Sequence, residues 1–224
     1  MNTIVYLIIA IGAILVIVLT GCSSNNTIID SRTLEPVQIK EYQGEKLSSI
    51  TDFRENSIKG AQYIDKASYR LNIGGLVNYP AYYTYEEVLS IYKIYTKIVK
   101  LDCVEGWSVT LLWEGTKIND LLQQADVLPA ARVVIFHAYD GYTTSLPLQY
   151  LKEKDLLLAY KINGVVLPPD RGFPFQLVAE DKWGYKWIKW ITRIELSDDE
   201  NYKGYWERSG YSNDGSLDKP FFDR

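Results

Sequence analysis

The sequence predicts a strand-rich α+β domain with short helices and many loops. Several short stretches alternate apolar and polar residues, and β-branched and aromatic residues fill them, which is typical of half-buried strands. Helical spacing of apolar residues is confined to brief segments. Beyond residue 49 about 175 residues follow, a length that suits one domain with a sizeable core.

The first half of this domain contains strands and two short helices. Residues 69–73 alternate like a strand, and Thr84-Tyr-Glu-Glu87 is a capping box that predicts a helix continuing through Ile94. Residues 98–104 and 108–113 are predicted strands. The spacing of Ile118, Leu121, Leu122 and Ala125 then indicates one buried face of a second helix.

The second half is richer in strands. Residues 132–138 form a β-branched run, Asp140-Gly141 marks a turn, and residues 156–160 are a further strand. Asn163-Gly164 predicts a tight hairpin, because both residues tolerate positive φ angles. A long strand is predicted over residues 188–196, where apolar side chains (Ile188, Trp190, Ile194, Leu196) alternate with charged ones (Lys189, Arg193, Glu195).

The N-terminus is expected to direct export. Residues 1–22 contain no charged side chain, and the apolar run from residue 4 to 19 is shorter than the roughly 20 residues of a comfortable membrane span. Leu19-Thr-Gly-Cys22 resembles a lipoprotein processing site, so Cys22 is predicted to carry lipid; an uncleaved N-terminal helix is the alternative. We expect a lipoprotein-type anchor over residues 1–22, a polar tether over 23–49 and one folded domain over 50–224, outside the cytoplasm and anchored to the cell membrane.

Charge and cysteine usage narrow the function classes. The net charge is −4, and no cluster of Lys and Arg interleaves with aromatic residues, which argues against nucleic acid as a partner. With Cys22 lipidated, Cys103 is the one thiol left, so it is either buried and inert or chemically active. His137 is the single histidine, which excludes a zinc-type cluster and favours a hydrogen-bonded core or rim side chain over an acid-base role.

Seven segments in order along the chain carry a family resemblance. They are Asn56-Ser-Ile-Lys-Gly60, Leu101-Asp-Cys-Val-Glu-Gly-Trp-Ser108 with Trp113-Glu-Gly115, Asp140-Gly-Tyr-Thr-Thr-Ser145, Leu157-Leu-Ala-Tyr160 with Asn163-Gly164, Pro168-Pro-Asp-Arg-Gly-Phe-Pro174, Gly184-Tyr-Lys-Trp-Ile-Lys-Trp190, and Gly204-Tyr-Trp-Glu207 with Gly210-Tyr211. Together they resemble the oxidoreductase molybdopterin-binding domain of sulfite oxidases, plant-type nitrate reductases and the periplasmic methionine-sulfoxide reductase catalytic subunit. The resemblance covers residues 56–211 and implies the sulfite-oxidase-type fold.

This resemblance implies a molybdenum-molybdopterin cofactor. Cys103 occupies the place of the cysteine that binds the metal, and a soft thiolate suits a metal that changes oxidation state. Glu105 matches an acidic residue near the metal, where a carboxyl can relay protons; a solvated carboxylate at a strand end is the alternative. Tyr142, Thr143 and Thr144 fall in a predicted loop near the pocket, for which we favour structural packing over substrate contact.

The pterin ends in a phosphate, which needs cationic and backbone donors. By similarity Asn56 and Lys189 match pterin-site positions and Lys186 is a neighbouring candidate; a turn residue and solvated lysines are the alternatives. Gln176 stands where the family pattern has an arginine, which weakens phosphate recognition. Arg171 is a candidate to compensate, unless it is a turn arginine exposed to water.

The implied activity is a two-electron oxygen-atom transfer on a small substrate such as an S- or N-oxide. The chain has no haem-binding motif, so electrons would pass through a separate partner, such as a membrane quinol or cytochrome protein. The alternative is a cofactor-free surface lipoprotein that keeps the fold for ligand binding or assembly. Gln176 and the lack of a twin-arginine signal in residues 1–21 favour this alternative, whereas the intact segment around Cys103 favours the enzyme.

Overall fold

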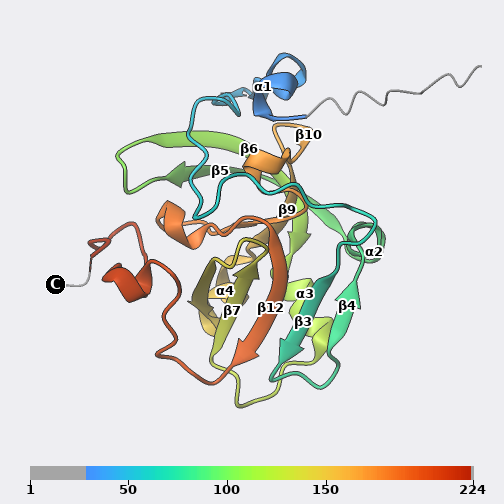
Figure 1. The fold of residues 1–224 in the computed structure, drawn as a ribbon, viewed down its shortest axis with the longest axis vertical. Coiled ribbons are helices and arrows are strands. Elements are labelled where there is room, and N and C mark those ends of the chain that lie inside the picture. Colours follow the sequence, from blue (N-terminus) through green and yellow to red (C-terminus); the bar gives the residue numbers. More distant parts are fainter. Residues whose placement is uncertain (1–28, 223–224) are drawn as a thin grey trace, which may run out of the picture.

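The computed structural model describes residues 29–222, which form two five-stranded sheets with short helices at their edges (Figure 1). The predicted α+β class is therefore confirmed. The predicted signal segment and Cys22 lie outside the described residues. None of the helices within residues 29–222 is long and apolar enough to span a membrane.

The first sheet has the strand order β4-β3-β12-β7-β8. Its strands are β3 (Leu71–Gly75), β4 (Ala81–Tyr83), β7 (Val133–Ala138), β8 (Thr143–Pro147) and β12 (Ile191–Ser197). The pair β12 and β3 is parallel, and the other neighbours are antiparallel. The predicted strands at 69–73 and 132–138 are confirmed within two residues of their bounds.

The second sheet has the order β10-β9-β6-β5, and β11 also pairs with β9. Its strands are β5 (Ile94–Asp102), β6 (Ser108–Lys117), β9 (Leu157–Ile162), β10 (Val165–Val166) and β11 (Gln176–Val178). The β9–β10 hairpin turns at Asn163 (φ 46°) and Gly164 (φ 77°), as the sequence predicts. The side chain of Asn163 is fully buried and hydrogen-bonds the backbone amide of Leu112, which ties the hairpin to β6.

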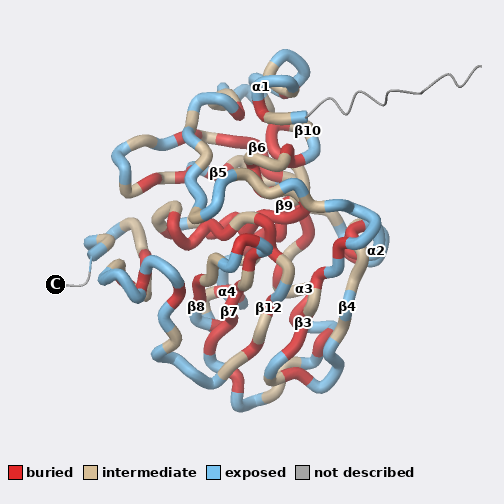
Figure 2. The backbone as a smooth tube through the Cα atoms, in the orientation of Figure 1, coloured by how far each residue is buried: buried red, intermediate tan, exposed pale blue. Residues whose placement is uncertain are grey.

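The helices cover the sheets at their ends. They are α1 (Ser31–Leu34), α2 (Tyr85–Ile91), α3 (Ile118–Ala125) and α4 (Leu148–Lys154). The predicted capping box of α2 is present, because Thr84 Oγ1 accepts from the Glu87 amide at 3.1 Å and Glu87 Oε2 accepts from the Thr84 amide at 2.7 Å. The predicted apolar stripe of α3 is buried in full. Red segments in Figure 2 follow the strands and α3, where the core lies.

Several predicted elements differ from the structure. Helix α2 ends at Ile91 and not at Ile94, because the chain turns extended at Tyr92 to begin β5. The long strand begins only at Ile191, because Trp190 has φ +54° and the backbone changes direction there. Residues 143–147 form β8 and not a loop, since they complete the first sheet beside β7.

The predicted tether is folded in its described part. Ser31 Oγ donates to Asp170 Oδ2 at 2.6 Å, and Gln38 accepts from the buried Ile50 amide at 2.9 Å. The hairpin of β1 (Glu41–Tyr42) and β2 (Glu45–Lys46) lies in the same stretch. Residues 29–49 thus pack on the domain, because their buried polar groups form hydrogen bonds there. The polar composition of this stretch predicts a tether and does not reveal these contacts.

Candidate functional site

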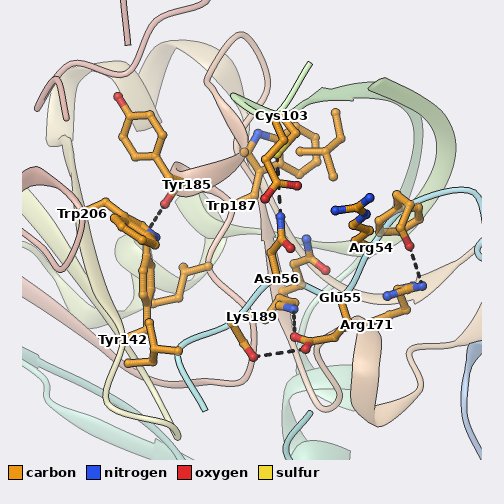
Figure 3. Close-up of a pocket in the computed structure, with 18 of the residues that line it drawn as sticks. Arg54, Glu55, Asn56, Cys103, Tyr142, Arg171, Tyr185, Trp187, Lys189 and Trp206 are labelled. Carbon is orange, nitrogen blue, oxygen red and sulfur yellow. Dashed lines mark hydrogen bonds and ion pairs between the residues drawn. The ribbon is translucent and has the colours of Figure 1, made fainter. Parts of the chain in front are cut away.

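A cavity of about 410 Å³ opens between the loops at the ends of the two sheets. It brings together most of the residues that the sequence singled out. Asn56, Cys103, Glu105, Arg171, Gln176 and Lys189 all line it. These residues are far apart in the chain, and Figure 3 shows the labelled ones converging from several separate segments.

Cys103 lies in the loop that joins β5 to β6. The pairing of Asp102 with Ser108 closes this loop, and the Cys103 amide donates to the Trp107 carbonyl at 2.9 Å. Gly106 has a φ angle of +87° in the turn, which glycine adopts without steric cost. Cys103 as a whole is 8 % exposed, and it lines the cavity. Burial raises the pKa of Cys103, and the nearby backbone amides and Asn56 only partly oppose this. The strand predicted to continue to Val104 therefore ends at Asp102, which leaves the thiol free to point into the cavity.

Asn56 links Cys103 to Glu105. Its Nδ2 lies 3.9 Å from Cys103 Sγ. Figure 3 marks this contact by a dashed line. Hydrogen bonds from Trp107 and then Asn56 lower the pKa of Glu105, and the Trp107 Nε1 to Glu105 Oε2 distance is 3.0 Å. Glu105 is exposed and lines the cavity, so it is an ionised carboxylate in contact with water. Only Val104 separates it from Cys103 in the sequence.

Lys189 projects into the cavity from the segment before β12. Its Nζ forms an ion pair of 2.6 Å with Glu55 Oε1 and lies 4.3 Å above the ring of Trp190. Burial lowers the pKa of Lys189, against the opposing effect of Glu55. The Lys189 side chain is 15 % exposed and lines the cavity. Lys189 is thus a cation held at the cavity wall by its pair with Glu55.

Arg171 is buried, so the alternative of a turn arginine exposed to water is wrong. Its Nε donates to the Ile50 carbonyl at 2.8 Å, one terminal nitrogen donates to the Phe53 carbonyl at 3.0 Å, and the guanidinium lies over the Phe53 ring. Gln176 is 5 % exposed on β11 and lines the cavity without a side-chain hydrogen bond to another described residue. Arg171 therefore anchors the loop that begins at Phe53, and Gln176 leaves an amide available to a ligand.

Asp140 is a buried carboxylate that the sequence analysis treated only as a turn residue. It is 2 % exposed and lines the cavity; its Oδ1 accepts from the Tyr142 amide at 2.9 Å, while Oδ2 has no hydrogen-bond partner among the described residues. A buried carboxylate oxygen without a partner is costly, so this atom marks a place for a ligand donor.

Other lining residues lie next to the predicted ones. Arg54 and Glu55 precede Asn56, and the rings of Trp206 and Tyr211 come from the last of the matched segments. Tyr142 also lines the cavity, and its hydroxyl donates to the Tyr185 carbonyl at 2.5 Å. The motifs contain Tyr142, Trp206 and Tyr211, whereas Arg54 and Glu55 lie just before the first motif, and only the geometry shows which of these side chains turn inward.

Two candidates do not line the cavity. Lys186 is fully buried and its Nζ pairs with Glu207 Oε1 at 2.5 Å, so its predicted place in the cofactor site is corrected to a core ion pair. His137 on β7 pairs with Glu195 at 2.8 Å on the neighbouring strand, consistent with the favoured interpretation of a rim histidine. Within the described residues no group of three or more His, Cys, Asp and Glu is placed to hold a metal ion.

A protein-family model and a solved structure are similar to this chain. The family model described as "Oxidoreductase molybdopterin binding domain" matches residues 58–206. Among solved structures, the crystal structure of the sulfane dehydrogenase SoxCD from Paracoccus pantotrophus is similar with a TM-score of 0.60 and 25 % identity, covering 67 % of this chain and 42 % of that one.

Curated proteins of similar sequence carry related names. An uncharacterized oxidoreductase, YuiH, of Bacillus subtilis is 37 % identical over 66 % of this chain and 75 % of its own length. A putative protein-methionine-sulfoxide reductase subunit, YedZ1, of Azospira oryzae is 31 % identical, covering 66 % of this chain and 56 % of its own length. The protein-methionine-sulfoxide reductase catalytic subunit MsrP of Gluconobacter oxydans is 35 % identical, covering 58 % of this chain and 47 % of its own length. The chain thus spans about half the length of the two reductase relatives.

Proposed function

The chain belongs to the oxidoreductase molybdopterin-binding domain family, and from this premise we propose that it is a molybdenum-dependent enzyme that transfers an oxygen atom to or from a small substrate such as an S- or N-oxide. The observation that carries the proposal is the cavity itself, whose lining includes Cys103, Asn56, Glu105 and Lys189. The names of two relatives favour sulfoxide reduction.

The residues present fit the cofactor. A cavity of about 410 Å³ is within the usual size for small-molecule and cofactor sites. A pterin ring is rich in N–H donors, and Asp140 Oδ2 is a buried acceptor without a partner in the described chain. Gln176 offers a further amide at the same cavity. Cys103 supplies the soft sulfur ligand that molybdenum bonded to a dithiolene prefers.

The chain's residues have separate tasks in this scheme. The bound cofactor supplies the two-electron chemistry, and Cys103 Sγ would hold its metal. Reduction of a sulfoxide to a thioether and water takes up two protons and two electrons. Glu105, ionised and open to water, would collect protons from solvent, and Asn56 would fix its orientation relative to Cys103.

The phosphate end of the cofactor is the weakest part of the fit. Lys189 is the cation best placed to bind the phosphate. Gln176 is neutral, and Arg171 already donates hydrogen bonds to the Ile50 and Phe53 carbonyls. Arg171 would add positive charge without a bidentate contact. This deficit is the observation that favours the second candidate, a cofactor-free surface lipoprotein.

Location and partners complete the proposal. An anchor at Cys22 would hold the domain outside the cytoplasm at the membrane, where a quinol or cytochrome partner would exchange electrons with it. The support is the apolar N-terminal sequence and the absence of a haem-binding motif. The exposed rings of Tyr205 and Trp206 beside the cavity offer a contact surface for such a partner or for substrate.

One experiment separates the two candidates. The protein and its Cys103→Ala variant are produced in a host that makes molybdopterin, and molybdenum and oxidised pterin are measured per protein chain. We expect near-stoichiometric metal in the parent, loss of metal in the variant, and reduction of a sulfoxide with a dye electron donor by the parent alone. Well-folded parent protein without metal or pterin would refute the enzyme and leave the cofactor-free lipoprotein.

A further inference from the structure

The ammonium of Lys189 already has an anion bound to it, and that anion belongs to the chain. Glu55 Oε1 lies 2.6 Å from Lys189 Nζ, and both side chains line the cavity. Their side chains are 24 % and 15 % exposed, so the pair is largely shielded from water. Figure 3 shows the pair beside Asn56. Glu55 thus occupies the place where an anionic group of a ligand would meet Lys189.

The segment that carries Glu55 is attached to the domain by side chains. Residues 54–57 belong to no helix or strand, and their backbone amides donate no hydrogen bond to another backbone group of residues 29–222. The segment is held by Arg171 at the Phe53 carbonyl, by Asn56 at Cys103 Sγ and Glu105, and by the Glu55–Lys189 pair. Within the segment the Ser57 hydroxyl donates to Glu55 Oε2 at 3.2 Å, a contact that can move together with Glu55. Glu55 can therefore leave Lys189 without breaking a strand ladder or a helix.

The charge of the cavity makes this pair consequential. The lining carboxylates (Glu55, Glu105, Asp140, Asp170) outnumber the lining cations (Arg54, Arg171, Lys189). A phosphate that approaches Lys189 while Glu55 stays in place would meet a like charge within a few ångströms, which disfavours binding. Gln176 contributes no charge to offset this repulsion.

We propose that Glu55 is a built-in counter-ion of Lys189 that competes with a phosphate group for the same ammonium and so sets the affinity of the cavity for phosphorylated ligands. The inference rests on the proposed function only for the identity of that ligand, a phosphate monoester attached to a pterin. In the free protein Glu55 keeps a shielded lysine paired, and on binding it moves toward solvent as the phosphate replaces it.

The test uses inorganic phosphate as the probe and protein from a host that makes no molybdopterin. Phosphate affinity is measured by calorimetry for the parent, Glu55→Gln and Glu105→Gln. The Glu105 variant is the matched control, because it removes one negative charge from the same cavity without touching Lys189. We expect about tenfold tighter binding for Glu55→Gln and a change below about twofold for Glu105→Gln.

A second background checks that the effect passes through Lys189. In Lys189→Met protein, adding Glu55→Gln should leave phosphate affinity unchanged. Thermal unfolding without phosphate confirms that each variant is folded, and Glu55→Ala replaces Glu55→Gln if the glutamine variant is not. Equal gains for Glu55→Gln and Glu105→Gln, no gain for Glu55→Gln, or no detectable phosphate binding in any of the proteins would overturn the inference.

The same variants distinguish this inference from the proposed function. Tighter phosphate binding by Glu55→Gln, together with no molybdopterin in protein from a host that makes it, would support the counter-ion and refute the enzyme. Normal molybdopterin content with unchanged phosphate affinity in Glu55→Gln would do the reverse.

Discussion

Two lysines three residues apart, Lys186 and Lys189, each pair with a glutamate, and the two pairs differ in almost every physical respect. The pair of Lys186 and Glu207 is 0 % exposed at both side chains, and Lys186 also donates to the Ser145 carbonyl at 3.1 Å. The pair of Lys189 and Glu55 lines the cavity and is partly open. Identical residue types in one segment thus serve the core in one case and a ligand site in the other.

The difference arises from what lies opposite each lysine. Lys186 precedes the turn at Trp187 and points to Glu207, which also accepts from the Thr144 hydroxyl at 2.6 Å, so β8 and the C-terminal segment meet there. Lys189 faces a loop without regular structure. A charged pair enclosed by two packed elements cannot rearrange, whereas a pair with one partner on a loop can exchange that partner for a ligand.

The largest effect is expected in the enclosed pair. Lys186→Met leaves Glu207 buried without its cation, which should lower the free energy of unfolding by about 3 to 5 kcal/mol. Urea denaturation followed by tryptophan fluorescence measures it. Because Trp206 and Tyr211 are close to Glu207 in sequence and line the cavity, cofactor content should also fall.

A double variant sharpens this prediction. Lys186→Met combined with Glu207→Met replaces the pair by apolar side chains and should regain much of the lost stability. If the single Lys186→Met variant were as stable as the parent, the pair would not be the enclosed structural element that the comparison requires.

A smaller change in stability and a larger one in ligand binding are expected at the open pair. Lys189→Met should cost only about 1 kcal/mol, because Glu55 can turn toward water, while the molybdopterin retained after purification should fall to less than a tenth of the parent value. Denaturation and pterin fluorescence are measured on the same samples. A Lys189→Met protein that keeps its pterin, or unfolds as easily as Lys186→Met, would remove the distinction between the two pairs.

Local sequence patterns predict much of this fold. The capping box at Thr84, the stripe of α3 and the hairpin at Asn163 are each decided by residues close in the chain, and all three are present. The long strand fails at its start because alternation continues through Trp190, although its φ of +54° ends the pattern. The sequence also does not predict that residues 29–49 fold onto the domain. Some of the residues they contact, such as Asp170, which bonds Ser31, are more than a hundred positions away.

In the candidate site, too, the motifs predict some features, whereas others depend on residues that are distant in the sequence. Motif order predicts that Cys103, Asn56, Glu105 and Lys189 belong to one site, and all four line the same cavity. The family pattern favours Lys189 over Lys186, but the sequence does not show that Lys186 is buried against Glu207, because that depends on the residue packed opposite it. The sequence also assigns Asp140 to a turn, since burial of a carboxylate with one free oxygen depends on packing and not on its neighbours in sequence.

The smallest effect belongs to a third pair, Lys182 and Asp214, whose carboxylate is more exposed than Glu55 or Glu207. Burial raises the pKa of Asp214, but hydrogen bonds from Lys182, Lys219 and Ser216 outweigh it and hold that pKa well below the usual 3.8. The folded state therefore favours the ionised form, so this contribution to stability is present above about pH 4 and is lost as the pH falls below that value. The Asp214 side chain is 35 % exposed and solvent screens the pair, so Asp214→Asn should cost less than about 1 kcal/mol at pH 7. Urea denaturation at pH 7, 4, 3 and 2 should show the parent losing stability toward the variant as the pH falls. A gap that widened on acidification would mean that Asp214 is not stabilised as a carboxylate and that the graded order of the three pairs is wrong.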